Sequence, residues 1–119
     1  MIRVRYDWDP AAGRLRLTVR GHAGAAPAGR DLVCASASIL AYTAAAVLRD
    51  TERGRAEITE MQTADGLFTV AAVCDGRTEE RVDAVCTGFR LLAEQYPQYV
   101  RFEKNFQKWG ENRECGTLK

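Results

Sequence analysis

The stretch that decides the fold is IRVRYDWDPAAGRLRLTVR, residues 2–20. Apolar and polar residues alternate with a period of two on both sides of a connector, residues 9–13, that is rich in Pro, Ala and Gly. Side chains along a strand point alternately to opposite faces. Two such runs joined by a turn-forming segment predict an antiparallel hairpin, with strands at 2–8 and 14–20.

Two later segments have the spacing of amphipathic helices. The first runs from Asp31 to about Arg49, and the second runs from about Thr78 to Tyr96, where Pro97 stops it. The apolar residues at helical spacing are expected to form the buried stripe of each helix. They are Ile39, Tyr42, Ala46 and Val47 in the first helix, and Val82, Val85, Cys86, Phe89, Leu92, Ala93 and Tyr96 in the second.

Three further runs predict strands. Residues 56–61 and 67–74 form a second pair around a turn at 63–66, and residues 99–103 form a last short strand. The run from 67 is almost wholly apolar, so this strand is expected to be central and covered on both faces. The order strand-strand-helix-strand-strand-helix-strand predicts the α+β class, with one mixed or antiparallel sheet and two helices packed on it.

Length and composition indicate one globular domain. The chain has 119 residues, 46% of them hydrophobic, and a net charge of +1. We expect a single domain over residues 1–103, followed by a tail over residues 104–119 that lacks a clear period and is partly disordered. The near-zero net charge argues against a nucleic-acid coat protein, and direct contact with nucleic acid is not expected.

The cysteines indicate a reducing compartment. Cys34, Cys74, Cys86 and Cys115 have neither CxxC spacing nor the density of a disulfide scaffold, and no secretory leader is apparent, so a cytoplasmic protein is expected. Residues 32–48 carry no charge, but their Cys, Ser, Thr and Ala content favours a helix packed on the sheet over a membrane span. With one histidine and no pair at ligand spacing, no metal site is expected.

One segment, GHAGAAPAGRDLVCASAS at residues 21–38, carries the candidate chemistry. His22 ends a strand, Asp31 stands where a helix N-cap belongs, and Cys34 is then the third residue of the helix. Unpaired N–H groups and the positive end of the helix dipole favour a thiolate there. With His22 as acid and base, Cys34 is a candidate nucleophile, and the N–H groups at the helix start are candidate oxyanion donors.

Each of these residues also has a structural interpretation. A lone cysteine on a helix that faces a sheet is commonly core filler, and a lone histidine at a strand end is commonly a surface residue. Asp is a preferred N-cap, which favours a cap over a third catalytic member for Asp31. Ser38, one turn after Cys34, is open to a bond with substrate, with Asp31 or with the carbonyl one turn back.

The same segment contains a signature. It consists of Gly21-His22-Ala23, then Gly29, Asp31, Val33-Cys34-Ala35 and Ser38. In this spacing, and in the order of elements over most of the chain, the sequence resembles the ribosomal-processing cysteine proteases (Prp). The resemblance implies that Cys34 is the nucleophile and His22 its acid/base partner. It also implies supporting roles for Asp31 and Ser38 and a substrate loop that includes Gly21, Gly24 and Gly29.

The resemblance carries further expectations. Members of this family remove a short N-terminal extension from a large-subunit ribosomal protein (number twenty-seven), cutting after an aromatic-rich segment. They work as cytoplasmic homodimers without a cofactor. A ribosomal protein substrate, a second copy of the chain and the absence of a cofactor are therefore expected here.

Two other functions fit parts of the sequence. Residues 1–20 hold five arginines against two aspartates, and Arg3, Arg5, Arg14 and Arg16 share the polar face of the predicted hairpin. That face suits a non-catalytic interaction module for ribosome assembly. A thiol redox protein centred on Cys34 ranks last, because no resolving cysteine stands at CxxC spacing.

Overall fold

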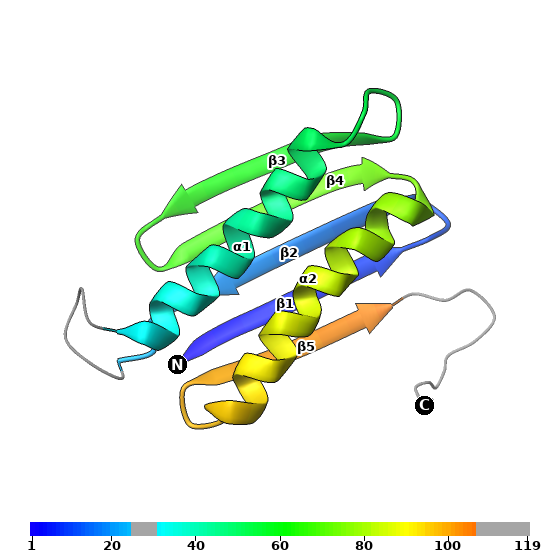
Figure 1. Cartoon of the computed structure of the whole chain (residues 1–119). Coiled ribbons are helices and arrows are strands. Elements are labelled where there is room, and N and C mark those ends of the chain that lie inside the picture. Colours follow the sequence, from blue (N-terminus) through cyan, green and yellow to red (C-terminus); the bar gives the residue numbers. More distant parts are fainter. Residues whose placement is uncertain (25–30, 107–119) are drawn as a thin grey trace.

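Seven elements follow one another in the predicted order (Figure 1). The computed structural model describes residues 1–24 and 31–106, and within them it has one sheet of five strands and two helices. The α+β class is therefore confirmed. The strands are β1 (Ile2–Asp9), β2 (Arg14–Arg20), β3 (Ala56–Ala64), β4 (Leu67–Cys74) and β5 (Val100–Phe106), and the helices are α1 (Leu32–Asp50) and α2 (Gly76–Gln95).

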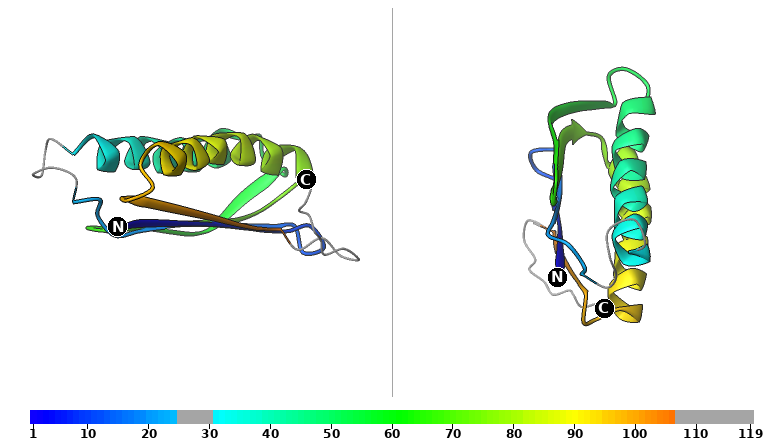
Figure 2. Two further views of the ribbon diagram at one scale, coloured as in Figure 1. Left: turned by 90° about the horizontal axis from the view of Figure 1, so that it is seen from below. Right: turned by 90° about the vertical axis from the view of Figure 1, so that its left-hand side faces the viewer.

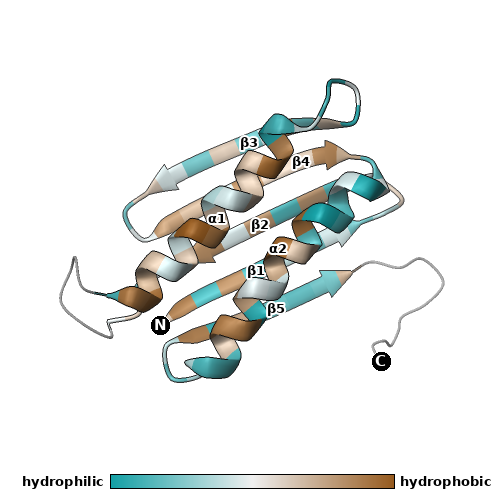
Figure 3. Ribbon diagram, viewed as in Figure 1, coloured by the Kyte–Doolittle hydropathy of each residue, from teal (hydrophilic) through white to brown (hydrophobic). Residues whose placement is uncertain are grey.

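The sheet is mixed, and its two helices lie on the same face. The strand order is β3-β4-β2-β1-β5, with β5 parallel to β1 and the other neighbours antiparallel. Figure 2 shows α1 and α2 side by side over one face and no described helix over the other. Hydrophobic and hydrophilic residues alternate along β1 and β2 (Figure 3), so the arginines of the hairpin point to the open face.

The buried face of α1 differs from the prediction. Ile39 is 64% exposed and Tyr42 is 52% exposed. The prediction was wrong at these two residues, whereas Val47 is partly buried against the core. Alanines form most of the buried face because they are small and let the helix lie close to the sheet and to α2. The approach is close at Gly88 of α2, where an added Cβ would lie 2.5 Å from Leu40 Cδ2. The buried residues of α1 are Val33, Ala37, Ala41, Ala44, Ala45 and Leu48.

By length and composition alone, α1 is also apolar enough to cross a membrane. That is weak evidence, since the core helix of a globular protein passes the same test. The alanine face of α1 packs against the core, as the sequence predicted for residues 32–48. In α2 the predicted stripe is confirmed at Val82, Cys86 and Phe89, whereas Tyr96 caps the helix and is exposed.

The strand β4 is less covered than its sequence predicts. It lies between β3 and β2, yet Val73 is 41% exposed. Coverage on both faces was a wrong prediction because both helices pack on the same side of the sheet, and an apolar run cannot reveal that. Its neighbour β3 is three residues longer than predicted, since Gln62, Thr63 and Ala64 stay paired with β4 although the apolar alternation has ended.

The last strand also extends beyond its predicted end. β5 continues through Phe106, three residues into the segment that was expected to be a tail. Parallel pairing with β1 holds these residues, and the Lys104 Nζ atom lies 2.8 Å from Asp83 Oδ1 of α2. The rest of the predicted tail, 107–119, lies outside the described residues, as do Cys115 and the loop residues 25–30.

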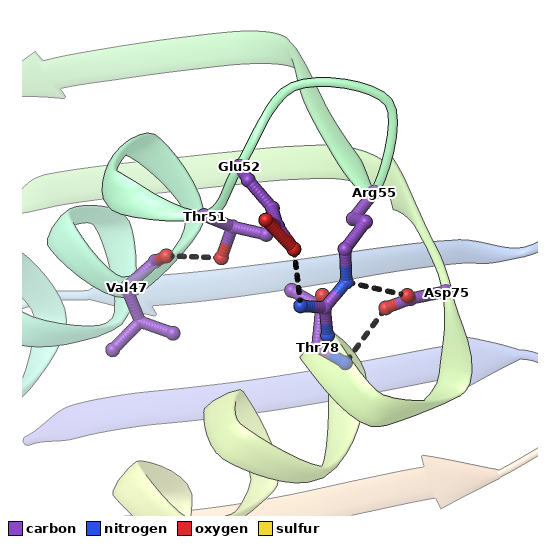
Figure 4. A network of polar contacts seen from close by, with 6 residues as sticks. All are labelled: Val47, Thr51, Glu52, Arg55, Asp75 and Thr78. Atoms are coloured by element: carbon purple, nitrogen blue, oxygen red, sulfur yellow. Dashed lines mark hydrogen bonds and ion pairs between the residues drawn. The ribbon is translucent and has the colours of Figure 1, made fainter.

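A polar cluster joins the turn after α1 to the start of α2 (Figure 4). Arg55 donates from Nε to Asp75 Oδ2 at 2.9 Å and from Nη1 to Glu52 Oε1 at 3.1 Å. Asp75 is the N-cap of α2 and accepts from the Thr78 N–H at 2.8 Å. The hydrogen bonds from Thr78, with that from Arg55, hold the pKa of Asp75 well below its usual range.

One carboxyl group is buried in the core. Glu79 is 5% exposed, and its Oε2 atom accepts a hydrogen bond of 2.9 Å from the Tyr6 hydroxyl. Burial raises the pKa of Glu79, although the Tyr6 hydrogen bond works in the opposite direction. The folded protein therefore binds this proton more tightly than the unfolded chain does.

This buried carboxyl predicts a pH dependence of stability. The contribution of Glu79 is complete below the unfolded pKa of about 4.3 and is lost as pH rises through the higher folded pKa. We expect Glu79→Gln to lose less stability than the wild type between about pH 4 and pH 7. Thermal unfolding at both pH values measures this, with Glu94→Gln on the exposed face of α2 as control. Equal pH dependence in Glu79→Gln and the wild type would contradict the argument.

Candidate active site

His22 follows the end of β2 and is held by backbone contacts on both sides. The Gly21 N–H donates to the Gly66 carbonyl oxygen at 2.9 Å, and the Met1 amino group donates to the His22 carbonyl oxygen at 2.6 Å. Gly21 has a φ of +95°, and a Cβ there would overlap the Met1 carbonyl. A glycine is therefore required at the residue that turns the chain into His22.

Cys34 lies in the first turn of α1, where Asp31 caps the helix. The Asp31 Oδ1 atom accepts from the N–H of Val33 at 3.1 Å and from the N–H of Cys34 at 3.0 Å. The N-cap prediction for Asp31 is thereby confirmed. The thiol of Cys34 is half-buried, and its Sγ atom accepts from the Ala23 N–H at 3.3 Å.

The cap changes one expectation about the oxyanion. Two of the first-turn N–H groups that were candidate donors, those of Val33 and Cys34, already donate to Asp31. These two capping bonds do not include the N–H of Leu32. The N-cap predicted for Asp31 implies this competition, because an N-cap side chain accepts from the N–H groups of the second and third helical residues.

His22 and Cys34 line one cavity of about 220 Å³ at the end of the sheet beneath α1. Ser38 lines the same cavity, and it forms neither of the two intramolecular bonds considered for it within the described residues. Tyr42 and Phe68 supply an aromatic wall, with ring centroids 5.5 Å apart in an edge-to-face arrangement. The structure thus brings the predicted thiol, imidazole and hydroxyl together.

The remaining predicted residues lie around this cavity or outside the described chain. Gly21 is part of the cavity lining, and Gly24 has a φ of +67° with nothing within 4 Å of an added Cβ. Gly29 falls in the segment 25–30 that the structure does not describe. In residues 1–24 and 31–106, no group of three or more His, Cys, Asp or Glu side chains is placed to hold a metal ion.

Two other thiols differ from Cys34 in their surroundings. Cys74 is 9% exposed and Cys86 is 1% exposed, which confirms the prediction that both are small core residues. Burial raises the pKa of Cys74 to about 11 and that of Cys86 to about 12. Both thiols therefore stay protonated at neutral pH and are poor nucleophiles.

The sequence interpretation missed Asp65 as part of this site. The turn Asp65-Gly66 between β3 and β4 was recognised only as a turn, but the Asp65 Oδ1 atom lies 3.7 Å from His22 Nε2. The pairing of β4 with β2 brings this turn beside the end of β2, with Leu67 opposite Arg20. An Asp-Gly turn gave no signal of its own, because the strand order decides which side chain it meets.

Asp31 offers a test that separates capping from catalysis. We expect Asp31→Ala to lower the free energy of unfolding by about 1 kcal/mol, because two N–H groups lose their acceptor. Asp31→Asn keeps a side-chain oxygen and should be nearly as stable as the wild type. Urea unfolding measures both variants. A large loss of stability in Asp31→Asn would show that the carboxylate does more than accept these bonds.

The class of protein that suits this fold and this pair of side chains is a small hydrolase with a cysteine nucleophile. Comparison with protein families narrows the class, because residues 1–101 match the family described as cysteine protease Prp. The chain belongs to that family and is a cysteine protease. The comparison with curated proteins gave no match.

Solved structures share the fold. The ribosomal processing protease Prp from S. aureus with a covalently linked product peptide is 20% identical, with a TM-score of 0.71 over 90% of this chain and 100% of that chain. The same protease with a substrate peptide is 19% identical, with a TM-score of 0.61 and the same coverage. SMU.848 from Streptococcus mutans is 25% identical, with a TM-score of 0.63 over 90% of this chain and 96% of that chain.

Proposed function

We propose that Cys34 is the nucleophile of this protease and His22 its general base and acid. The observation that carries the proposal is the shared cavity, in which the end of β2 and the first turn of α1 present these two side chains. The Ala23 N–H on the Cys34 sulfur supports it, because an N–H donor stabilises a thiolate. Ser38 also lines the cavity, and the role that we assign to its hydroxyl group is a hydrogen bond to substrate.

The reaction follows from these groups. His22 takes the proton of the Cys34 thiol, and the thiolate attacks the carbonyl carbon of the scissile peptide bond. The imidazolium then protonates the amine that leaves as the C–N bond breaks, and a thioester to Cys34 remains. Water, deprotonated by His22, attacks the thioester and releases the acid product and the free thiol.

The substrate we propose is the N-terminal extension of a large-subunit ribosomal protein, number twenty-seven. Two structures in the comparison are described as a ribosomal processing protease with a product or a substrate peptide. The aromatic pair of Tyr42 and Phe68 gives the cavity a wall suited to aromatic side chains ahead of the cut. Leu32 and Ile39, which are seven residues apart on α1, are further exposed apolar side chains.

The substrate assignment is tested with peptides. A peptide that spans the junction between the extension and the mature protein should be cut once, after its aromatic-rich segment, and mass spectrometry locates the cut. A scrambled peptide of the same composition is the control. Equal cleavage of both peptides would leave the protease without the proposed specificity, and cleavage of neither would reject the substrate.

We also propose that the protein acts in the cytoplasm as a homodimer. Support for a dimer comes from the Prp family, whose members are expected to work as homodimers. Light scattering coupled to size exclusion gives the mass in solution. A mass of one chain at micromolar concentration would overturn the dimer.

A second function deserves a test because of three arginines. Arg3 stands opposite both Arg20 and Arg101 across three neighbouring strands, and within the described residues none of the three forms an ion pair. Like charges at such positions are destabilising, so a negatively charged partner would relieve them. If this face belongs to a ribosome-assembly module, the Cys34→Ala variant should bind the partner as tightly as the wild type does. Binding should weaken as the salt concentration rises.

A further inference from the structure

We propose that Asp65 is a positioning residue for His22: its carboxylate holds the Nε2–H of the imidazole, so that Nδ1 is the nitrogen that takes the Cys34 proton. This inference rests on the proposed function of the Cys34–His22 pair, and it concerns which ring nitrogen of His22 takes the thiol proton. The turn Asp65-Gly66 is thereby part of the active site.

The first support is the direction of the ring. The Nε2 atom of His22 lies 3.7 Å from Asp65 Oδ1, which is within the range of an ion pair and longer than a hydrogen bond. Hydrogen bonds of catalytic groups are often long without substrate and shorten when it binds. A carboxylate accepts hydrogen bonds only, so the nitrogen that faces it carries the proton.

The second support is Gly66, which gives the ring its place. A Cβ on Gly66 would lie 2.9 Å from His22 Nε2 and 3.4 Å from Cδ2, so the imidazole occupies the space that a side chain would need. The Gly66 carbonyl also accepts the Gly21 N–H at 2.9 Å. The turn therefore holds His22 in three ways. The Gly66 carbonyl binds the neighbouring Gly21 N–H, the absence of a side chain at Gly66 leaves room for the ring, and the Asp65 carboxylate faces Nε2.

The third support is the position of the sulfur. Cys34 Sγ lies against the Ala23 N–H, beside the backbone of the residue that follows His22. In a histidine, Nδ1 is bonded to Cγ and lies nearer the backbone than Nε2 does. With the proton of the neutral ring on Nε2, Nδ1 is the nitrogen that is free to accept a proton. The thiol proton then moves to Nδ1, and the imidazolium later passes that proton to the leaving amine.

The experiment uses the fact that the chain has one histidine. In protein labelled with ¹⁵N-histidine, a long-range ¹H–¹⁵N correlation spectrum shows a single imidazole and identifies which nitrogen carries the proton. In the wild type with a neutral ring, we expect Nε2–H alone. In Asp65→Ala we expect a mixture of both tautomers. Nδ1–H in the wild type, or an unchanged spectrum in Asp65→Ala, would overturn the proposal.

Two matched pairs of variants separate positioning from charge and from backbone strain. Asp65→Ala should lower kcat about 10-fold with little change in KM, whereas Asp50→Ala, which removes an exposed carboxylate at the other end of α1, should not. Gly66→Ala should disturb the tautomer, whereas Gly54→Ala should not, since both glycines have positive φ but only Gly66 faces the imidazole. Equal kcat values in Asp65→Ala and Asp50→Ala would contradict the role.

The spectrum also separates this proposal from the proposed function. It reports on the His22 ring whether or not a peptide is cut. If the wild type cuts no peptide, the proposed substrate is rejected. The tautomer of His22 still decides whether Asp65 has the proposed role. If the enzyme is active but the neutral His22 ring is a mixture of both tautomers, the positioning role of Asp65 is rejected. The catalytic roles of Cys34 and His22 are then retained.

Discussion

Replacing Cys34 with alanine should lower kcat for peptide cleavage by at least ~10⁴-fold, because none of the other described residues that line the cavity carries a thiol. The fold should be unaffected, since the side chain is half-buried at the first turn of α1 and alanine suits a helix. Steady-state cleavage of the extension peptide measures the loss, and circular dichroism checks the fold.

The matched control is a thiol of the core. Cys86→Ala removes a side chain that is 1% exposed and remote from the cavity lining, so it should cost stability and leave kcat within about twofold. Iodoacetamide should likewise inactivate the wild type through Cys34, since burial keeps the Cys86 thiol protonated. Cleavage by Cys34→Ala at the wild-type rate would reject the mechanism.

Replacing Gly21 with alanine should have the second largest effect, on both stability and activity. Its φ of +95° disfavours any side chain, and the new Cβ would overlap the Met1 carbonyl. We expect a loss of about 3 kcal/mol in the free energy of unfolding, from backbone strain and the displaced β1 terminus together. Because His22 is the next residue, kcat should fall as well.

Gly54→Ala separates the two causes. Gly54 has a φ of +90°, close to that of Gly21, but nothing lies within 4 Å of an added Cβ. Gly54→Ala should lower the free energy of unfolding by only about 1 kcal/mol, because only the strain of the positive φ is added, and it should leave kcat unchanged. Urea unfolding of both variants gives the comparison. Equal losses would show that the contact with Met1 is unimportant.

Local patterns predicted most of the fold. The alternation around the residue 9–13 connector gave the first hairpin, and Pro97 marked the end of the second helix to within two residues. The buried face of α1 was not predictable from the large side chains Ile39 and Tyr42. Which face of a nearly all-apolar helix packs inward depends on how closely its neighbours approach, and that is decided by tertiary contacts such as Gly88 against Leu40.

The candidate site divides in the same way. His22, Cys34 and Asp31 lie within thirteen residues of sequence, so their spacing and the N-cap rule were enough to group them. Asp65 lies more than forty residues from His22 in sequence. Only the pairing of β4 with β2 brings it to the imidazole, and a single sequence does not specify that pairing.

The order of the strands has a consequence for how a peptide reaches the thiol. The cavity lies at the ends of β2 and β4, which are inner strands with neighbours on both sides, and Ala64, the last residue of the edge strand β3, also lines it. Strand addition, in which a peptide joins a sheet through a ladder of main-chain bonds, needs a free edge. The edge strand β3 reaches the cavity with its last residue alone, so peptide selection at the thiol depends on which side chains fit beside the aromatic wall.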